Sequence, residues 1–312
     1  MVEQLQLSLF DYQNECLQSQ TETKNASNLK WSHSKRNALE QCSKRYYYNY
    51  YGSNSKTAKE EPLKEKLAVL KKRTNRHITA GLVLHNLIKE TINKLQQGEE
   101  VSLEELLKQA QKRYKNQIGY FQRWKKKSVE IYYGIKNADE LIAETEDKLL
   151  RAIANLIQSP AFEIFRLFFS QPQSVVEKSL SIKENNLKLG GKLDFAYIDG
   201  DRLAIVDWKL GGNAGSSDTL QLISYAYLAS EKLGYAPENI DLHQAHLASN
   251  FISSFEIGKT EVFRAKNLIL QDLEMMNQVH DYGRRGISLA FPPCGKPRIC
   301  QLCPFQEVCP QE

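Results

Sequence analysis

The feature that most constrains this fold is a two-residue turn signal, Asp199-Gly200, between two runs of alternating apolar residues. Residues 193–198 and 203–206 each alternate in the way that predicts a β-strand, and Asp-Gly is a strong signal for a type I′ hairpin. The chain therefore contains antiparallel strands at this point, and the rest of the fold must be built around them.

This hairpin is expected to bring two carboxylates and a lysine to one face of a sheet. Because side chains alternate faces along a strand, Asp194 shares a face with Asp207 and Lys209 for any loop with an even number of residues. With Asp199-Gly200 as the loop, Asp194 lies opposite Ile205 and diagonal to Asp207, close enough for both carboxylates to reach one ion. Oxygen ligands suit Mg²⁺ or Mn²⁺, and a lysine beside the ion can help to deprotonate an attacking water. The alternative is a solvent-facing strand that carries ordinary surface charges, and Asp-x-Lys by itself does not decide between the two.

The remaining pattern predicts a helical region, a mixed α/β core and a cysteine-rich end. Apolar residues at helical spacing predict a helix over residues 79–95, and a buried face that includes Leu82, Leu84, Leu87, Ile88 and Ile92. The period changes near Ser174, where further strands are expected. We predict four parts: a polar segment at 1–30, a helical region at 31–173, the core at 174–280 and a cap at 281–312.

Composition sets limits on the class of protein. The 312 residues are 41% hydrophobic and 25% charged, which is typical of a globular chain, and the net charge of +5 permits a polyanionic partner without requiring one. We expect no membrane association, because no apolar run approaches the roughly 18 residues that a spanning helix needs. The first residues lack a basic and apolar leader, so a cytoplasmic location is expected.

Four short motifs occur in a fixed order around the hairpin. They are Gly81-Leu82-Val83-Leu84-His85, Gly191-Lys192-Leu193-Asp194, Val206-Asp207-Trp208-Lys209 and Gln221-Leu222-Ile223-Ser224-Tyr225. Together they resemble the RecB-like branch of the PD-(D/E)XK nuclease superfamily, over roughly residues 31 to 309. The resemblance implies an α/β fold with a mixed central sheet of the restriction-endonuclease-like type, flanked by helices.

The resemblance also implies a role for each motif. Its metal ligands would be His85, Asp194, Asp207 and the carbonyl of Trp208. Lys209 would be the catalytic lysine, while Gln221 and Tyr225, four apart on one helical face, would support the active site and the DNA strand. Taken alone, His85 would be an ordinary helix histidine, and only the accompanying motifs favour a ligand role. The alternative for Gln221 and Tyr225 is ordinary helix packing.

Six cysteines are placed unevenly, and four of them fall within the last nineteen residues. In a chain without an export signal, such a group indicates metal binding before disulfides. Cys42, Cys300, Cys303 and Cys309 resemble the signature of the iron–sulfur subset of the same nuclease branch, which implies a [4Fe–4S] cluster that ties the two ends of the chain together. Spacing alone leaves tetrahedral zinc open. Cys294 is a spare thiol or an alternative ligand, and Cys16 is expected to bind nothing.

Two further segments suggest partners. Residues 108–127 carry eight basic and no acidic side chains with interleaved aromatics, which predicts DNA contacts centred on Arg123, Trp124, Lys125 and Lys126. A solvated helix face is the alternative. Near the start, Gln6, Leu7, Leu9 and Phe10 belong to a short apolar island that resembles the peptide by which bacterial repair proteins dock on the sliding clamp.

The sequence therefore predicts a metal-dependent deoxyribonuclease that acts in DNA repair or recombination, as an exonuclease on single-stranded DNA or DNA ends. No phosphate-binding helicase loop is present, so any unwinding would come from a helicase partner. A CRISPR-adaptation nuclease of the same branch shares every motif. A non-catalytic DNA-binding scaffold with a metal staple is the alternative from a different class.

Overall fold

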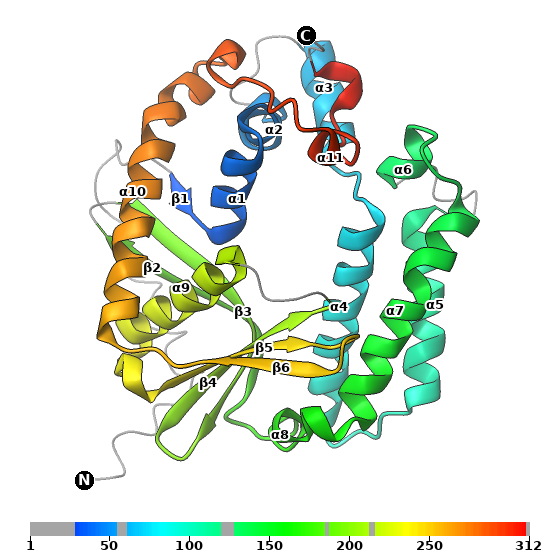
Figure 1. Ribbon diagram of the computed structural model, residues 1–312, viewed down its shortest axis with the longest axis vertical. Helices are drawn as coiled ribbons and strands as arrows, with labels where there is room; N and C mark the ends of the chain where they lie inside the picture. Colours follow the sequence, from blue (N-terminus) through cyan, green and yellow to red (C-terminus); the bar gives the residue numbers. More distant parts are fainter. Residues whose placement is uncertain (1–28, 55–60, 120–127, 185–186, 212–215, 310–312) are drawn as a thin grey trace.

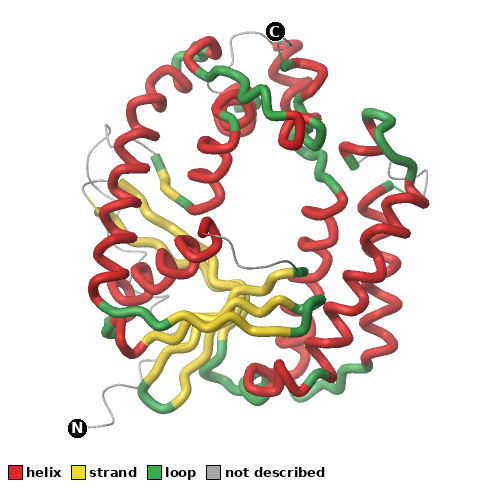
Figure 2. The backbone as a smooth tube through the Cα atoms, in the orientation of Figure 1, coloured by secondary structure: helices red, strands yellow, loops and turns green. Residues whose placement is uncertain are grey.

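A mixed β-sheet with helices on both faces forms the centre of the protein (Figures 1 and 2). The computed structural model describes residues 29–54, 61–119, 128–184, 187–211 and 216–309. The predicted fold class, an α/β fold with a central mixed sheet flanked by helices, is confirmed. Within these residues, no helix has both the length and the apolar character that crossing a membrane requires.

The sheet has six strands, five of which run in the order β1-β3-β4-β5-β6, while β2 pairs with the other edge of β3. Its strands are β1 (Lys30–Trp31), β2 (Val175–Glu184), β3 (Leu187–Asp199), β4 (Arg202–Lys209), β5 (Ile240–His246) and β6 (Phe251–Phe255). The pairs β1–β3 and β4–β5 are parallel, and the pairs β2–β3, β3–β4 and β5–β6 are antiparallel. The sequence pattern missed β1 and β6, which are short and lack a clear alternation.

The predicted hairpin forms with a different register. Asp199 pairs with Arg202, so the loop is Gly200-Asp201, one residue later than predicted. Only the first loop residue has a positive φ, +61° at Gly200, as a type II′ turn requires in place of type I′. The predicted pairing of Asp194 with Ile205 is therefore wrong, because Ile205 pairs with Ala196. The loop still has an even number of residues, so the argument about shared faces holds.

Two apolar clusters cover the two faces of the sheet. On one face, Leu203 and Ile205 of β4 pack with the buried residues of α9 and α10, and on the other face Val206 and Trp208 pack with those of α4, α7 and α8. The helices are α1 (His33–Gln41), α2 (Ser43–Tyr47), α3 (Glu61–Leu70), α4 (Arg76–Gln96), α5 (Leu103–Ile118), α6 (Val129–Tyr132), α7 (Ala138–Gln158), α8 (Glu163–Arg166), α9 (Ser216–Leu233), α10 (Lys259–Arg284) and α11 (Pro297–Cys300).

Helix α4 confirms a predicted helix and includes the predicted span of 79–95. Its N-cap is Asn75, whose side chain accepts a hydrogen bond from the backbone of Ile78 at 2.9 Å. One residue of the predicted buried face is wrong: Leu82 is 48% exposed, and Val83 is buried instead.

The segment around Cys42 packs against the C-terminal segment of the chain. Cys42 ends α1 and caps α2, and its sulfur accepts a hydrogen bond from the Arg45 backbone. Backbone and side-chain bonds then join this segment to the other end of the chain, including Lys44 N–H to the Pro292 carbonyl at 3.2 Å and Tyr48 hydroxyl to the Val308 carbonyl at 2.9 Å. Figure 1 shows α2 and α11 close together at the same end of the molecule.

Candidate active site

Three carboxylates lie in a row across neighbouring strands. Glu177 in β2 falls between the pairs Val176–Phe195 and Lys178–Leu193, which places it opposite Asp194 in β3. Continuing the β3–β4 register past its last recorded pair places Asp207 opposite Asp194 on the other side. The side chain of Asp207 is buried, with 3% exposure, and those of Glu177 and Asp194 are nearly so, at 12% and 11%.

An unusual backbone conformation at Glu177 helps to form this row. Its φ is +56°, in the left-handed region that non-glycine residues rarely adopt and that costs on the order of 1 kcal/mol. In a regular strand, residues that share a face are an even number of positions apart. Val175 and Leu180 are five apart, yet both pack on the α9 face, so the alternation of β2 is interrupted between them. Strained residues of this kind concentrate at functional sites.

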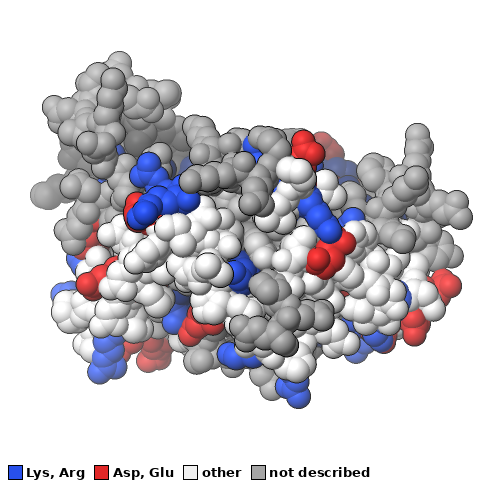
Figure 3. Space-filling model, turned by 90° about the horizontal axis from the view of Figure 1, so that it is seen from above, with Lys and Arg blue, Asp and Glu red and all other residues white. Residues whose placement is uncertain are grey.

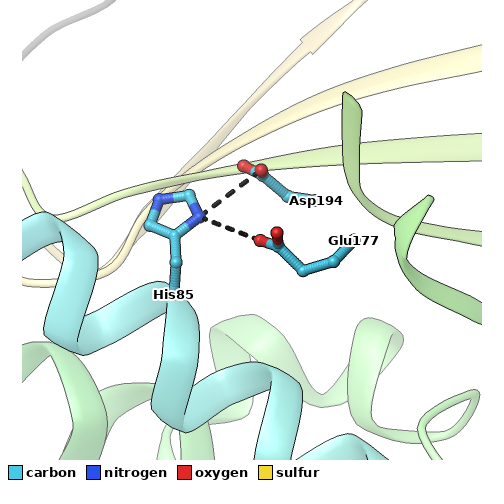
Figure 4. A group of neighbouring side chains, drawn as sticks. All are labelled: His85, Glu177 and Asp194. Carbon is cyan, nitrogen blue, oxygen red and sulfur yellow. Dashed lines mark ion pairs between the residues drawn. The ribbon is translucent and has the colours of Figure 1, made fainter. Parts of the chain in front are cut away.

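His85 extends from α4 towards this row (Figure 4). Its Nδ1 lies 3.4 Å from Asp194 Oδ1 and 3.7 Å from Glu177 Oε1. One ligand atom from each of the three side chains lies within 4.8 Å of the others, and this is the one such group of histidine, cysteine or acidic side chains found in the described residues. One nitrogen and several hard oxygens suit a hydrated Mg²⁺ or Mn²⁺.

Lys209 connects the carboxylates to α9. Its Nζ lies 2.9 Å from Asp207 Oδ2 and donates a hydrogen bond to Gln221 Oε1 at 3.2 Å. Gln221 in turn donates from Nε2 to the Tyr225 hydroxyl at 2.7 Å. A Cβ on Gly191 would come within 2.7 Å of the Tyr225 ring, so a glycine at that position lets the ring lie against β3. The Gly-x-x-Asp strand and the Gln-x-x-x-Tyr helix are thus packed directly against each other.

The electrostatics of the row favour a bound cation. Burial and the nearby Asp194 raise the pKa of Asp207, and Lys209 counteracts this only in part. Burial lowers the pKa of His85, but the charges of Asp194 and Asp207 outweigh it and leave that pKa raised. Both shifts show that positive charge is favourable here, which a divalent ion would supply.

Gln244 in β5 completes the row on the far side of Asp207. It pairs with Asp207 in the β4–β5 register, is fully buried, and donates from Nε2 to Asp207 Oδ2 at 3.3 Å. Its Oε1 has no hydrogen-bond partner within the described part of the chain. A buried acceptor without a donor is costly, and a water bound at a metal centre is a donor that would satisfy it. The residues around the row therefore fit a hydrated divalent ion.

The structure thus brings together the residues that the sequence singled out. Asp194, Asp207, Lys209, Gln221 and Tyr225 lie within one connected set of contacts, and His85 meets them from α4. Trp208 contributes its backbone N–H to Asp194 Oδ2 at 3.0 Å and its ring to the core, while its carbonyl as a metal ligand stays a prediction. The sequence analysis missed Glu177 and Gln244. The only signal for either was an acidic or amide side chain in a strand that is otherwise mostly apolar or basic.

The cysteines form a second centre at the other end of the molecule. Cys42, Cys300, Cys303 and Cys309 line one cavity, and Cys294 lines it with them, with its sulfur 3.9 Å from that of Cys300. Burial raises the pKa of Cys303 to about 11, so this thiol would ionise only beside a cation. Among the described residues, no three of these sulfurs lie within 4.8 Å of one another, whereas tetrahedral zinc with bonds of about 2.3 Å would hold its sulfurs about 3.8 Å apart. The 3.9 Å between the Cys294 and Cys300 sulfurs is close to that zinc spacing, so the cavity gathers the cysteines without distinguishing an iron–sulfur cluster from zinc.

Two predicted binding segments lie outside the described residues. These are the apolar island with Gln6, Leu7, Leu9 and Phe10, and the part of the basic segment with Arg123, Trp124, Lys125 and Lys126. The start of the basic segment lies in α5, where Lys108 and Arg113 form ion pairs with glutamates and Tyr114 is buried, as the alternative of a solvated helix face expects. Both stay predictions. Cys16 also lies outside the described part.

Comparison with known proteins establishes the family. Residues 30–310 match the PD-(D/E)XK nuclease superfamily, so this chain belongs to that superfamily. The RecB-like branch and the iron–sulfur subset are finer assignments that remain predictions. A search of curated proteins finds no match.

Two solved structures are also similar to this chain. It is similar to the protein SSO0001 at 16% identity, covering 58% of this chain and 78% of that chain with a TM-score of 0.29. It is also similar to a protein from Eubacterium rectale described as an inferred exonuclease, at 13% identity, covering 94% of this chain and 96% of that chain with a TM-score of 0.40. With TM-scores this low, nothing about the activity of either protein transfers to this chain.

Proposed function

We propose that this protein is a metal-dependent deoxyribonuclease of the RecB-like branch, an exonuclease that acts on single-stranded DNA or DNA ends in repair or recombination. The observation that supports this best is the row of Glu177, Asp194 and Asp207 with His85 at one side and Lys209 at the other. Two buried carboxylates beside a third, partly buried one are unfavourable together, and a bound cation would offset that cost.

In this proposal His85, Glu177, Asp194 and Asp207 hold the divalent ion, together with the carbonyl of Trp208. When bound, Mg²⁺ or Mn²⁺ polarises the phosphate and lowers the pKa of water. Glu177 is added here to the ligands that the sequence suggested.

Lys209 is proposed to act on the attacking water and on the charge that develops on the phosphate. Its ammonium group is held between Asp207 and Gln221, so it points at a fixed place beside the carboxylates. Tyr225 fixes the Gln221 amide in turn. Removing the amine would lose charge stabilisation without disturbing the apolar core.

The test is degradation of labelled DNA by purified protein. We expect a linear single-stranded oligonucleotide to be degraded with Mg²⁺ or Mn²⁺ and to survive in chelator, and a closed circular single strand to resist. Asp207→Asn and Lys209→Ala should each lower the rate by at least about a hundredfold. Asp201→Asn is the control, because it neutralises an exposed carboxylate at the turn of the same hairpin. Cleavage of the circle would replace the exonuclease with an endonuclease, and DNA binding without any cleavage would favour the scaffold alternative.

We also propose that Cys42, Cys300, Cys303 and Cys309 bind a [4Fe–4S] cluster that staples the two ends of the chain. The support is the cavity that the four cysteines share and the resemblance of their spacing in the sequence to the iron–sulfur signature. Protein purified without oxygen should be brown, with about four iron and four sulfide per chain. Stoichiometric zinc with no iron would contradict the proposal.

Partners are proposed on sequence grounds alone. Gln6, Leu7, Leu9 and Phe10 would dock on the bacterial sliding clamp, and Leu9→Ala with Phe10→Ala should abolish binding to purified clamp if this is right. A helicase would supply the unwinding that the chain lacks. A role in CRISPR adaptation remains the alternative pathway, and the neighbouring genes would distinguish it from repair.

A further inference from the structure

An exposed stripe of α4 leads directly to the metal-site histidine. Ile78, Gly81, Leu82 and His85 recur at helical spacing and so share one face of the helix. Ile78 is 42% exposed and Leu82 is 48% exposed, while the opposite face of α4 is buried in the core. Two large apolar side chains thus lie open on the approach to His85.

Gly81 is the most informative residue in this stripe. It lies inside a helix of 21 residues, where glycine is less favourable than alanine. A Cβ at this position would meet nothing within 4 Å, so the packing of the protein does not require a glycine there. What the glycine provides is a bare backbone one helical turn from His85, open to the close approach of something else.

A positive charge flanks the same approach. Lys148 of α7 is exposed, and its side chain packs against Gly211, two residues beyond Lys209. Burial, the neighbouring Arg76 and, to a smaller extent, the charge of Lys148 lower the pKa of His77, in the first turn of α4. Lys148 therefore lies between the end of β4 and the start of the exposed stripe. Figure 3 shows Lys and Arg side chains interspersed with Asp and Glu on the upper face of the molecule, without one large basic patch.

We infer that the Ile78–Gly81–Leu82 stripe is the surface along which a single nucleic-acid strand reaches the metal site. The sugar–phosphate backbone approaches most closely at Gly81, Ile78 and Leu82 contact sugars and unpaired bases, and Lys148 neutralises a phosphate. A duplex keeps its bases stacked inside and cannot make these apolar contacts. The inference rests on the proposed nuclease function and adds the residues that make the enzyme prefer single strands.

The test separates stability from binding. Binding of a fluorescent single-stranded oligonucleotide is measured by anisotropy with Ca²⁺ in place of Mg²⁺, and the Tm is measured on the same samples. Gly81→Ala should raise the Tm by about 2 °C, because alanine favours the helix, and should weaken binding by about tenfold. A higher Tm together with weaker binding is a result that would not follow if Gly81 served only the folding of α4.

Leu82→Ala provides a second test of the stripe, with a matched control. It should weaken binding of the single strand about tenfold and leave blunt duplex binding almost unchanged. Leu268→Ala is the control, since Leu268 is 46% exposed on α10 and lies on a different helix from the stripe. It should leave both affinities unchanged.

Each outcome decides the inference. Unchanged affinity in both Gly81→Ala and Leu82→Ala would overturn it, even if the wild-type protein degrades single-stranded DNA. A lower Tm for Leu82→Ala with unchanged affinity would instead show that the stripe packs against another part of this chain, which also overturns it. If the wild-type protein binds single strands through the stripe but cleaves nothing, the nuclease function fails and the binding surface stands.

Discussion

Glu177 offers the sharpest test of the metal centre, because it is the ligand that only the structure suggests. The Glu177→Gln substitution keeps the size and shape of the side chain and removes one negative charge. In the wild-type protein the Glu177 carboxylate forms an ion pair with Lys192 and lies 3.7 Å from His85 Nδ1. The metal-free variant loses that ion pair and also loses repulsion from Asp194, so the absolute stability is a poor readout. The increment of stability that the metal adds is the better one.

The size of that increment follows from binding linkage. At a metal concentration one hundred times its Kd, binding stabilises the folded state by about 2.7 kcal/mol. Losing even an outer-shell partner of a metal site weakens binding by about 10- to 100-fold, and losing a charged ligand should weaken it at least as much. The same metal concentration would then stabilise Glu177→Gln by only about 0.4 to 1.4 kcal/mol. For a chain of 312 residues these values correspond to a Tm rise of about 4 °C for the wild type and about 0.6 to 2 °C for the variant.

The assay is thermal unfolding with and without Mn²⁺. Glu184→Gln is the control, because Glu184 is at the other end of β2, where it pairs with Lys266. That variant should keep the full metal-linked rise whatever its own Tm. If Glu177→Gln also keeps the full rise, Glu177 does not bind the metal, and the ligand set returns to His85, Asp194 and Asp207.

Three further changes have expected outcomes. Gly283→Ala would place a Cβ 2.7 Å from the Tyr51 ring. The overpacking cost of about 1 to 3 kcal/mol should exceed the gain in helix stability of about 1 kcal/mol, so the variant should be less stable. A urea midpoint equal to or above that of the wild type would contradict this. Asp272→Ala removes a carboxylate that accepts a hydrogen bond from the buried Trp31 and forms an ion pair with Arg36. The substitution should lower the free energy of unfolding by about 3 kcal/mol in urea titrations. Cys42→Ser should lose most of the iron, whereas Cys294→Ser should retain it. Loss of iron in Cys294→Ser would make Cys294 a ligand, and full retention in Cys42→Ser would remove Cys42 from the ligands.

The sequence predicted the parts of the fold that depend on local periodicity. Helix α4 and the β3–β4 hairpin follow from spacing and turn chemistry, which act over a few residues. The hairpin register did not follow, because Asp199-Gly200 and Gly200-Asp201 are both acceptable two-residue hairpin loops, the first in a type I′ turn and the second in a type II′ turn. The shared face of Asp194 and Asp207 was still predictable, since it depends only on whether the loop length is even.

The parts of the site that escaped prediction depend on neighbours distant in sequence. Glu177 reaches the row because its backbone adopts a positive φ, which no local pattern of side chains in β2 indicates. Gln244 reaches it because β5 adds to the sheet in parallel beside β4, after the intervening helix α9. Neither event can be read from spacing, since both are decided by how the strands are assembled.

The candidate site also explains a cost that the fold carries. Asp194 and Asp207 are buried beside a partly buried Glu177, and the nearest positive charges are Lys192, Lys209 and a histidine that burial would otherwise keep neutral. Burying carboxylates without full compensation destabilises the folded state. Replacing Asp207 with asparagine should therefore leave the metal-free protein at least as stable as the wild type, although it removes the activity. A row of side chains that is unfavourable without a cation and favourable with one is what a metal-dependent site requires, and a purely structural role gives no reason for its burial.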